Sequence, residues 1–71
     1  MLSLSEQQKA KFGLELATKR QDHSDMDAAI HALIQSHRAD QMVIMRLKKH
    51  KLLIKDRIVE LEKLLLPEII A

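Results

Sequence analysis

Apolar residues recur at alternating intervals of three and four along residues 40–66, the spacing that places side chains on one face of an α-helix. Asp40 precedes this pattern and is a favoured helix N-cap residue. Pro67 follows it, and a proline disfavours helical backbone at the residue before it. The pattern predicts a helix over residues 40–66, about 40 Å long at 1.5 Å per residue. Its positions are Ile44, Leu47, Lys51, Ile54, Ile58, Leu61 and Leu65.

A less regular heptad pattern covers residues 16–36. Leu16, His23, Ile30 and His37 are seven residues apart, and Met26 and Leu33 fall between them. This spacing predicts a helix with a coiled-coil-like packing face. Arg20, Asp22, Ser24 and Asp25 interrupt it, and Ser24 is of a type that favours helix N-caps. The pattern therefore allows either one continuous helix or a break near residue 23.

Residues 4–15 predict an additional N-terminal helical segment. Ser3 and Glu6 have the spacing of a capping box, in which the two residues satisfy each other's backbone N–H groups. Gly13 weakens a helix by about 1 kcal/mol relative to alanine. The apolar residues here follow no regular period. The segment either extends the next helix or folds back on it.

Residues 35–40 contain no apolar periodicity and predict a short loop. Helices joined by short loops are usually antiparallel neighbours. We therefore expect an all-α fold, with residues 1–71 forming one small domain: a two-helix antiparallel hairpin, the N-terminal segment 4–15 and an apolar tail over 67–71. The hairpin seam is predicted to contain His23, Met26, Ile30, Leu33, Leu47, Ile54, Ile58 and Leu61.

The predicted second helix carries a second apolar row. Met45, Leu52, Val59 and Leu66 are seven residues apart and lie about 140° around the axis from the seam. Packing on a single neighbour requires a stripe only about 100° wide. The second row therefore predicts a second neighbour: the N-terminal segment, another copy of the chain, or a different helical protein. Lys48, Lys55 and Glu62 lie between the two rows, where they extend outward or pair across an interface.

The length of the chain favours association. A chain of 71 residues without cysteine has no disulfide, and cores of this size rarely supply more than about 3–5 kcal/mol. We therefore expect a homo-oligomer, dimer or higher, or a complex with a helical partner.

Positive charge is concentrated in residues 46–57, with six basic residues and one acidic residue. A solvated helix face explains such a run, because the charges are spread around the axis. The alternative is a small basic nucleic-acid-associated protein, although no aromatic side chain accompanies the run to stack on bases. The candidate anion contacts are Lys48, Lys49, Lys51, Lys55 and Arg57.

The sequence predicts no catalysis, no cofactor and no small-molecule substrate. Four histidines, at 23, 31, 37 and 50, lack the convergent spacing that a zinc site requires, and a single glycine excludes a glycine-rich phosphate loop. We expect His23 to be half-buried in the seam. No apolar run approaches the roughly 20 residues of a membrane span, and no signal-peptide pattern is present, so a cytoplasmic location is expected. Membrane-surface attachment is a weaker option, since tryptophan and tyrosine are absent.

Residues 46–58 resemble the motif of the YdcH-like family of small bacterial proteins, which reads Leu-Lys-Lys-x-Lys-Leu-x-x-Lys-Asp-x-Ile. The matching residues are Leu47, Lys48, Lys49, Lys51, Leu52, Lys55, Asp56 and Ile58. Upstream, His23, Ile30 and Leu33 match a second apolar run of the family, in which Met26 replaces the usual leucine. The resemblance covers residues 16–63 and implies a helical hairpin, often self-associating, of unsettled function and without catalytic residues. It also suggests that Lys51 pairs with a carboxylate and fixes the geometry of a partner.

Overall fold

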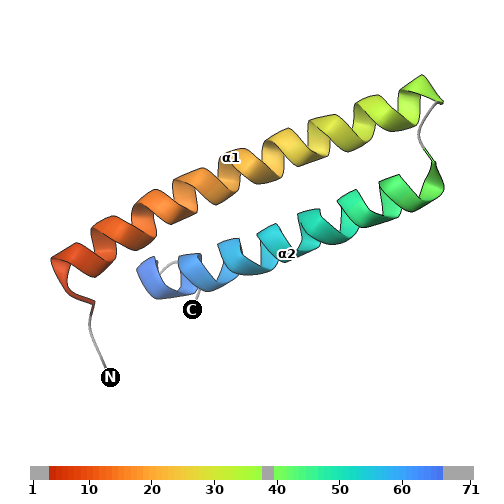
Figure 1. Cartoon of the computed structure of the whole chain (residues 1–71). Coiled ribbons are helices and arrows are strands. Elements are labelled where there is room, and N and C mark those ends of the chain that lie inside the picture. Colours follow the sequence, from red (N-terminus) through yellow and green to blue (C-terminus); the bar gives the residue numbers. More distant parts are fainter. Residues whose placement is uncertain (1–3, 38–39, 67–71) are drawn as a thin grey trace.

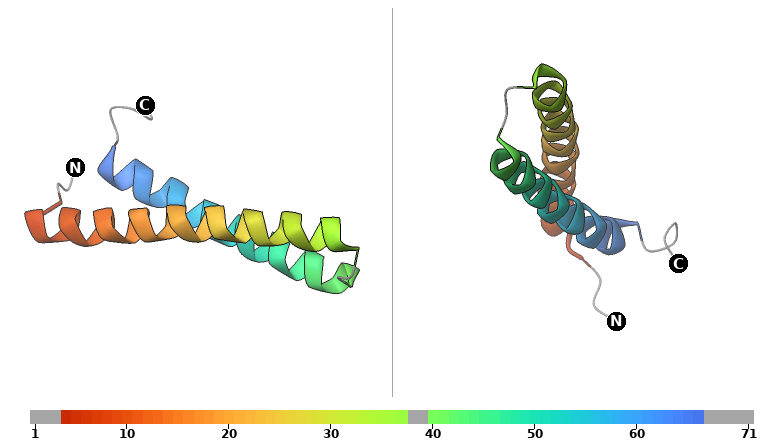
Figure 2. Two further views of the ribbon diagram at one scale, coloured as in Figure 1. Left: turned by 90° about the horizontal axis from the view of Figure 1, so that it is seen from above. Right: turned by 90° about the vertical axis from the view of Figure 1, so that its right-hand side faces the viewer.

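The computed structural model describes residues 4–37 and 40–66, which form two long antiparallel α-helices lying side by side (Figure 1). Helix α1 spans Glu6–Ser36, 31 residues, and helix α2 spans Gln41–Leu65, 25 residues. The chain measures 49 × 20 × 17 Å, so it is a rod about as long as its longer helix. Seen from above, the two helices cross at a shallow angle (Figure 2, left). The predicted all-α antiparallel hairpin is confirmed.

A capping box starts α1 at Ser5, two residues later than the predicted box at Ser3 and Glu6. The Ser5 hydroxyl accepts a hydrogen bond from the Gln8 backbone N–H at 3.1 Å, and the Gln8 side chain accepts one from the Ser5 N–H at 2.8 Å. The sequence contains both overlapping serine motifs, and the structure uses the second one. Glu6 instead occupies the first turn, where the positive end of the helix dipole stabilises its carboxylate. Ser3 lies outside the described residues.

Helix α1 is continuous, so the structure has no separate helix over 4–15 and no break near residue 23. Gly13 costs only about 1 kcal/mol in a helix interior, and Phe12 packs against the core cluster that contains Leu16. This contact extends the seam past Gly13 into the first turns of α1. Near the predicted break, the Gln21 side-chain amide donates to Asp25 at 2.8 Å along the exposed side of the helix.

The helix ends that face the loop are both capped. His37 ends α1 in the left-handed conformation, with φ 57° and ψ 20°, and its N–H donates to the Ile34 carbonyl at 3.4 Å. Asp40 caps α2 as predicted, because its carboxylate accepts from the Met42 N–H at 2.9 Å. The loop residues 38 and 39 and the predicted apolar tail 67–71 lie outside the described residues.

The core is a single seam between the two helices. Its main cluster contains Leu16, Ile54, Ile58 and Leu61, and Leu61 is fully buried at 0% exposure. Ile30 and Ile44 are buried nearer the loop, whereas His23, Met26, Leu33 and Leu47 of the predicted seam are half-buried. No polar or charged side chain in the described ranges is fully buried. Such a narrow core leaves most of each helix facing outward.

Candidate interaction surface

Met45, Leu52, Val59 and Leu66 form one row along α2, here called the outer row. Met45 is 63% exposed, Leu52 62% and Val59 36%, while Leu66, at the end of the helix, is half-buried. α1 packs against the opposite seam through Ile54, Ile58 and Leu61. Within residues 4–37 and 40–66, α1 therefore leaves the outer row uncovered over most of its length, and no separate N-terminal helix covers it.

A second apolar surface lies on the other side of α2. Val43, Leu53 and Leu64 are 41%, 59% and 44% exposed. Leu53 borders a shallow, open groove between the helices, whose floor includes Met26, Leu47 and Ile54. At 100° per residue, Leu53 lies about 100° around the axis from Leu52. The two leucines are thus similarly exposed but point in different directions.

Four exposed lysines border the outer row. Lys48 and Lys55 lie on one side of it, and Lys49 and Lys63 on the other. Each is three or four residues from a member of the row, a separation that makes side chains neighbours on a helix surface. No hydrogen bond or ion pair joins these four lysines to another residue within 4–37 or 40–66.

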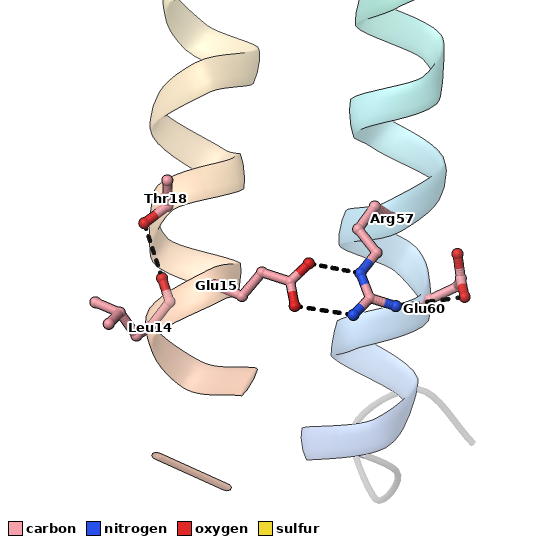
Figure 3. Close-up of polar contacts among 5 residues, drawn as sticks. All are labelled: Leu14, Glu15, Thr18, Arg57 and Glu60. Atoms are coloured by element: carbon pink, nitrogen blue, oxygen red, sulfur yellow. Dashed lines mark hydrogen bonds and ion pairs between the residues drawn. The ribbon is translucent and has the colours of Figure 1, made fainter. Parts of the chain in front are cut away.

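Two of the predicted anion contacts have partners within the hairpin. The Lys51 Nζ lies 2.7 Å from the Asp27 carboxylate. Arg57 binds Glu15 through two parallel hydrogen bonds, with Nε donating at 2.7 Å and Nη2 at 2.8 Å (Figure 3). The same guanidinium lies 3.6 Å from Glu60. Both basic groups connect α2 to α1, so Lys48, Lys49 and Lys55 are the candidate contacts whose charge is uncompensated within the described chain.

These pairs shift the pKa values of Glu15, Asp27 and Arg57. The hydrogen bonds from Arg57 lower the pKa of the Glu15 carboxyl, and the bond from Lys51 lowers that of Asp27. In return, Glu15 raises the pKa of Arg57. Each of these shifts favours the charged form of its group, as expected for ion pairs between the two helices.

The interhelical pairs are the polar feature that sequence reasoning missed. The sequence predicts that Lys51 pairs with a carboxylate of a partner. In the structure, that carboxylate belongs to Asp27 of the chain's own α1. Besides the two pairs above, Arg20 contacts Glu62 at 3.3 Å across the seam. Opposite charges at positions flanking the heptad seam were visible in the sequence. Matching them required the register of the hairpin, which depends on where α1 ends and α2 begins.

Other chemistry has little support in the described ranges. Within 4–37 and 40–66, no three histidine or acidic side chains gather closely enough to hold a metal ion. Neither helix there is long and apolar enough to cross a membrane. His23 is half-buried, and His31 and His50 are exposed.

The chain matches the model of a known protein family. A family model described as "Protein of unknown function (DUF465)" matches residues 16–62. Neither the curated proteins nor the solved structures yield a match. The matched span contains most of both helices, the three exposed members of the outer row and three of its four bordering lysines, and it agrees with the resemblance to the YdcH-like proteins. The chain belongs to the DUF465 family of small helical proteins.

Proposed function

We propose that this chain is a non-enzymatic interaction module that binds a helical partner through the outer row of α2. The partner is either a second copy of the chain or a different protein. The observation that supports this proposal is the exposure of Met45, Leu52 and Val59 in one row on the side of α2 away from α1. Apolar anchors repeated along one helix face are the usual contact set when two helices pack together.

The energetics favour a covered row. Burying a large apolar side chain completely contributes about 1.5–3 kcal/mol. A row of three such side chains, each more than a third exposed, therefore offers several kcal/mol to a partner before the costs of association. The core of a chain this small supplies only about 3–5 kcal/mol on its own. Association through the outer row would thus add stability comparable to that of the hairpin itself.

Paired double variants on α2 test this proposal. Leu52→Glu with Val59→Glu places two charges in the outer row, and Leu53→Glu with Leu64→Glu places the same two charges on the other exposed face. All four positions are at least 36% exposed, so both variants should keep the helicity measured by circular dichroism. If the partner is a second copy, we expect the first variant to lose the association that light scattering measures as solution mass, and the second variant to keep it. If the partner is a different protein, we expect the same contrast in binding to a designed amphipathic helix. The proposal fails if the outer-row variant keeps the association or the binding that the wild type shows.

A small nucleic-acid-associated protein is the second candidate, supported by the exposed and unpaired Lys48, Lys49 and Lys55. Binding through phosphate contacts must weaken steeply as salt rises. The candidate predicts binding of a mixed-sequence DNA duplex or single strand at low salt, lost in Lys48→Glu with Lys55→Glu. If the chain binds neither the duplex nor the single strand at low salt, the nucleic-acid candidate is rejected. Because Lys51 and Arg57 are engaged by α1, three of the five candidate contacts remain available to a phosphate backbone.

A further inference from the structure

Charge on both sides of the outer row indicates what kind of partner it fits. On one side the order is Lys48, Lys55 and Glu62, and on the other it is Lys49, Asp56 and Lys63. The border thus contains four lysines and two carboxylates. Glu62 is already engaged by Arg20 at 3.3 Å, whereas none of the four lysines has a partner within the described ranges. The uncompensated charge around the apolar row is strongly positive.

We propose that the outer row binds an acidic amphipathic helix of another protein, in which an apolar stripe is flanked by glutamates or aspartates. This inference rests on the proposed function and names the chemistry of its partner. The apolar stripe would cover Met45, Leu52 and Val59, and its flanking carboxylates would pair with the bordering lysines. Charges at such flanking positions set partner choice between packed helices, and complementary potentials raise both specificity and association rate.

A second copy of the chain is the poorer fit. In a twofold symmetric contact between outer rows, the same surface appears on both sides, so eight lysines would face four carboxylates, two of them engaged by Arg20. The acidic residues of α1 do not offer a better site. Its exposed large apolar residues are only Leu14 and Ile34, which lie twenty positions apart and form no row. In a twofold contact the bordering lysines would therefore repel one another. A different protein with carboxylates at the matching positions would instead attract them.

An anionic membrane surface also carries negative charge, but the row is poorly suited to it. Tryptophan and tyrosine are the residues enriched at membrane interfaces, and the chain contains neither. Asp56 lies directly beside Leu52 and Val59, at the centre of the row, where a lipid surface of the same sign would repel it. A helix with discrete charges can place a cation opposite Asp56 and carboxylates opposite the lysines.

The test uses the full chain and two designed probe peptides of about four heptads, both with leucine at the core positions. One peptide has glutamate at every flanking position and the other has lysine there. Binding is measured by titration calorimetry at about 50 mM and about 500 mM salt, since screening weakens exposed pairs. The protein variants are Leu52→Glu, Leu53→Glu, and Lys48→Glu with Lys55→Glu. Vesicles of phosphatidylserine and phosphatidylcholine form a separate arm.

We expect the wild type and Leu53→Glu to bind the glutamate peptide, more weakly at high salt, and not to bind the lysine peptide. Leu52→Glu should lose binding while retaining helicity. The double lysine variant should bind the glutamate peptide at least about tenfold more weakly and gain affinity for the lysine peptide.

Equal binding of both peptides, no binding of either, or binding to vesicles alone would overturn the acidic-helix inference. A wild-type dimer that Leu52→Glu dissociates would also overturn it, yet would leave the proposed function standing. If Leu52→Glu changes neither peptide binding nor solution mass, the proposed function itself fails.

Discussion

Leu61 is the one fully buried large side chain of the described hairpin, and shortening it should destabilise the fold more than any other leucine-to-alanine change on α2. At 0% exposure, Leu61→Ala removes three carbon groups from the centre of the cluster formed with Leu16, Ile54 and Ile58. At about 0.8 kcal/mol per buried group, the lost transfer free energy is about 2.4 kcal/mol. The two-helix core is open at its edges and can partly close around the gap, so the cavity adds little and the total stays near the lower end of the usual 2–5 kcal/mol.

The expected loss is large relative to the stability of a chain this small. A change of about 2.4 kcal/mol lowers the ratio of folded to unfolded protein roughly 50-fold, and cores of this size supply only about 3–5 kcal/mol. Leu53→Ala is the matched control, since Leu53 lies on the same helix but is 59% exposed. It should change the free energy of unfolding by no more than about 0.5 kcal/mol.

Urea denaturation followed by circular dichroism at 222 nm measures both variants, at several protein concentrations so that any association is separated from folding. We expect a much lower urea midpoint for Leu61→Ala and a nearly unchanged one for Leu53→Ala. Equal midpoints for the two variants would show that the hairpin does not derive its stability from the Leu61 cluster, and the packing described for the seam would be incorrect.

Three further predictions concern Gly13, the Asp40 cap and the pH dependence of the interhelical pairs. Gly13→Ala should stabilise the chain by about 0.5–1 kcal/mol, because Gly13 lies inside α1 and an added Cβ would meet nothing within 4 Å beyond its chain neighbours and the local helix backbone. A lower melting temperature would show that the helix is not continuous there. Asp40→Ala should cost about 1 kcal/mol through loss of the α2 cap, whereas Asp40→Asn should cost much less, and equal losses would reject the capping role. The pH dependence follows from Glu15 and Asp27, whose folded pKa values lie below the ordinary 4.5 and 3.8. As pH falls, the unfolded chain binds protons first, so both pairs stabilise the fold above these ordinary pKa values and lose that contribution as pH falls below them. The difference in urea midpoint between wild type and Glu15→Gln should therefore shrink between about pH 7 and about pH 2.5. A difference that stays constant would contradict the link between Glu15 and Arg57.

Much of this fold could be predicted from the spacing of apolar residues. The regular pattern over 40–66 predicted α2 and its Asp40 cap to within a residue, because one strong period and two clear end signals agree. The pattern over 16–36 was ambiguous because Arg20, Asp22, Ser24 and Asp25 interrupt it. In the structure these residues lie on the exposed side of α1, where they do not disturb the helix.

The start of α1 could not be predicted as well. Overlapping motifs at Ser3 and Ser5 offer two similar caps, and a local pattern does not distinguish them. Phe12 packs with Leu16 and the end of α2, a long-range contact that joins residues 6–15 to the main helix and outweighs the cost of Gly13. The interhelical pairs of Glu15 with Arg57 and Asp27 with Lys51 depend on the same long-range register.

The outer row was visible in the sequence as a second set of residues seven apart. Its accessibility could not be predicted, because the N-terminal segment was a possible cover. The continuous α1 removes that cover and leaves Met45, Leu52 and Val59 exposed. The unpaired state of the bordering lysines also required the structure, since Lys51 and Arg57 belong to the same basic run and are engaged by α1.

The most direct test of the outer row is the solution mass by light scattering, with and without the glutamate-flanked peptide, for the wild type and the two double variants of α2. We predict a gain in mass corresponding to one bound peptide for the wild type and for Leu53→Glu with Leu64→Glu, and no gain for Leu52→Glu with Val59→Glu. A wild type that remains a monomer at every concentration and also ignores the peptide would contradict the claim, as would a gain in mass that the outer-row charges leave unchanged.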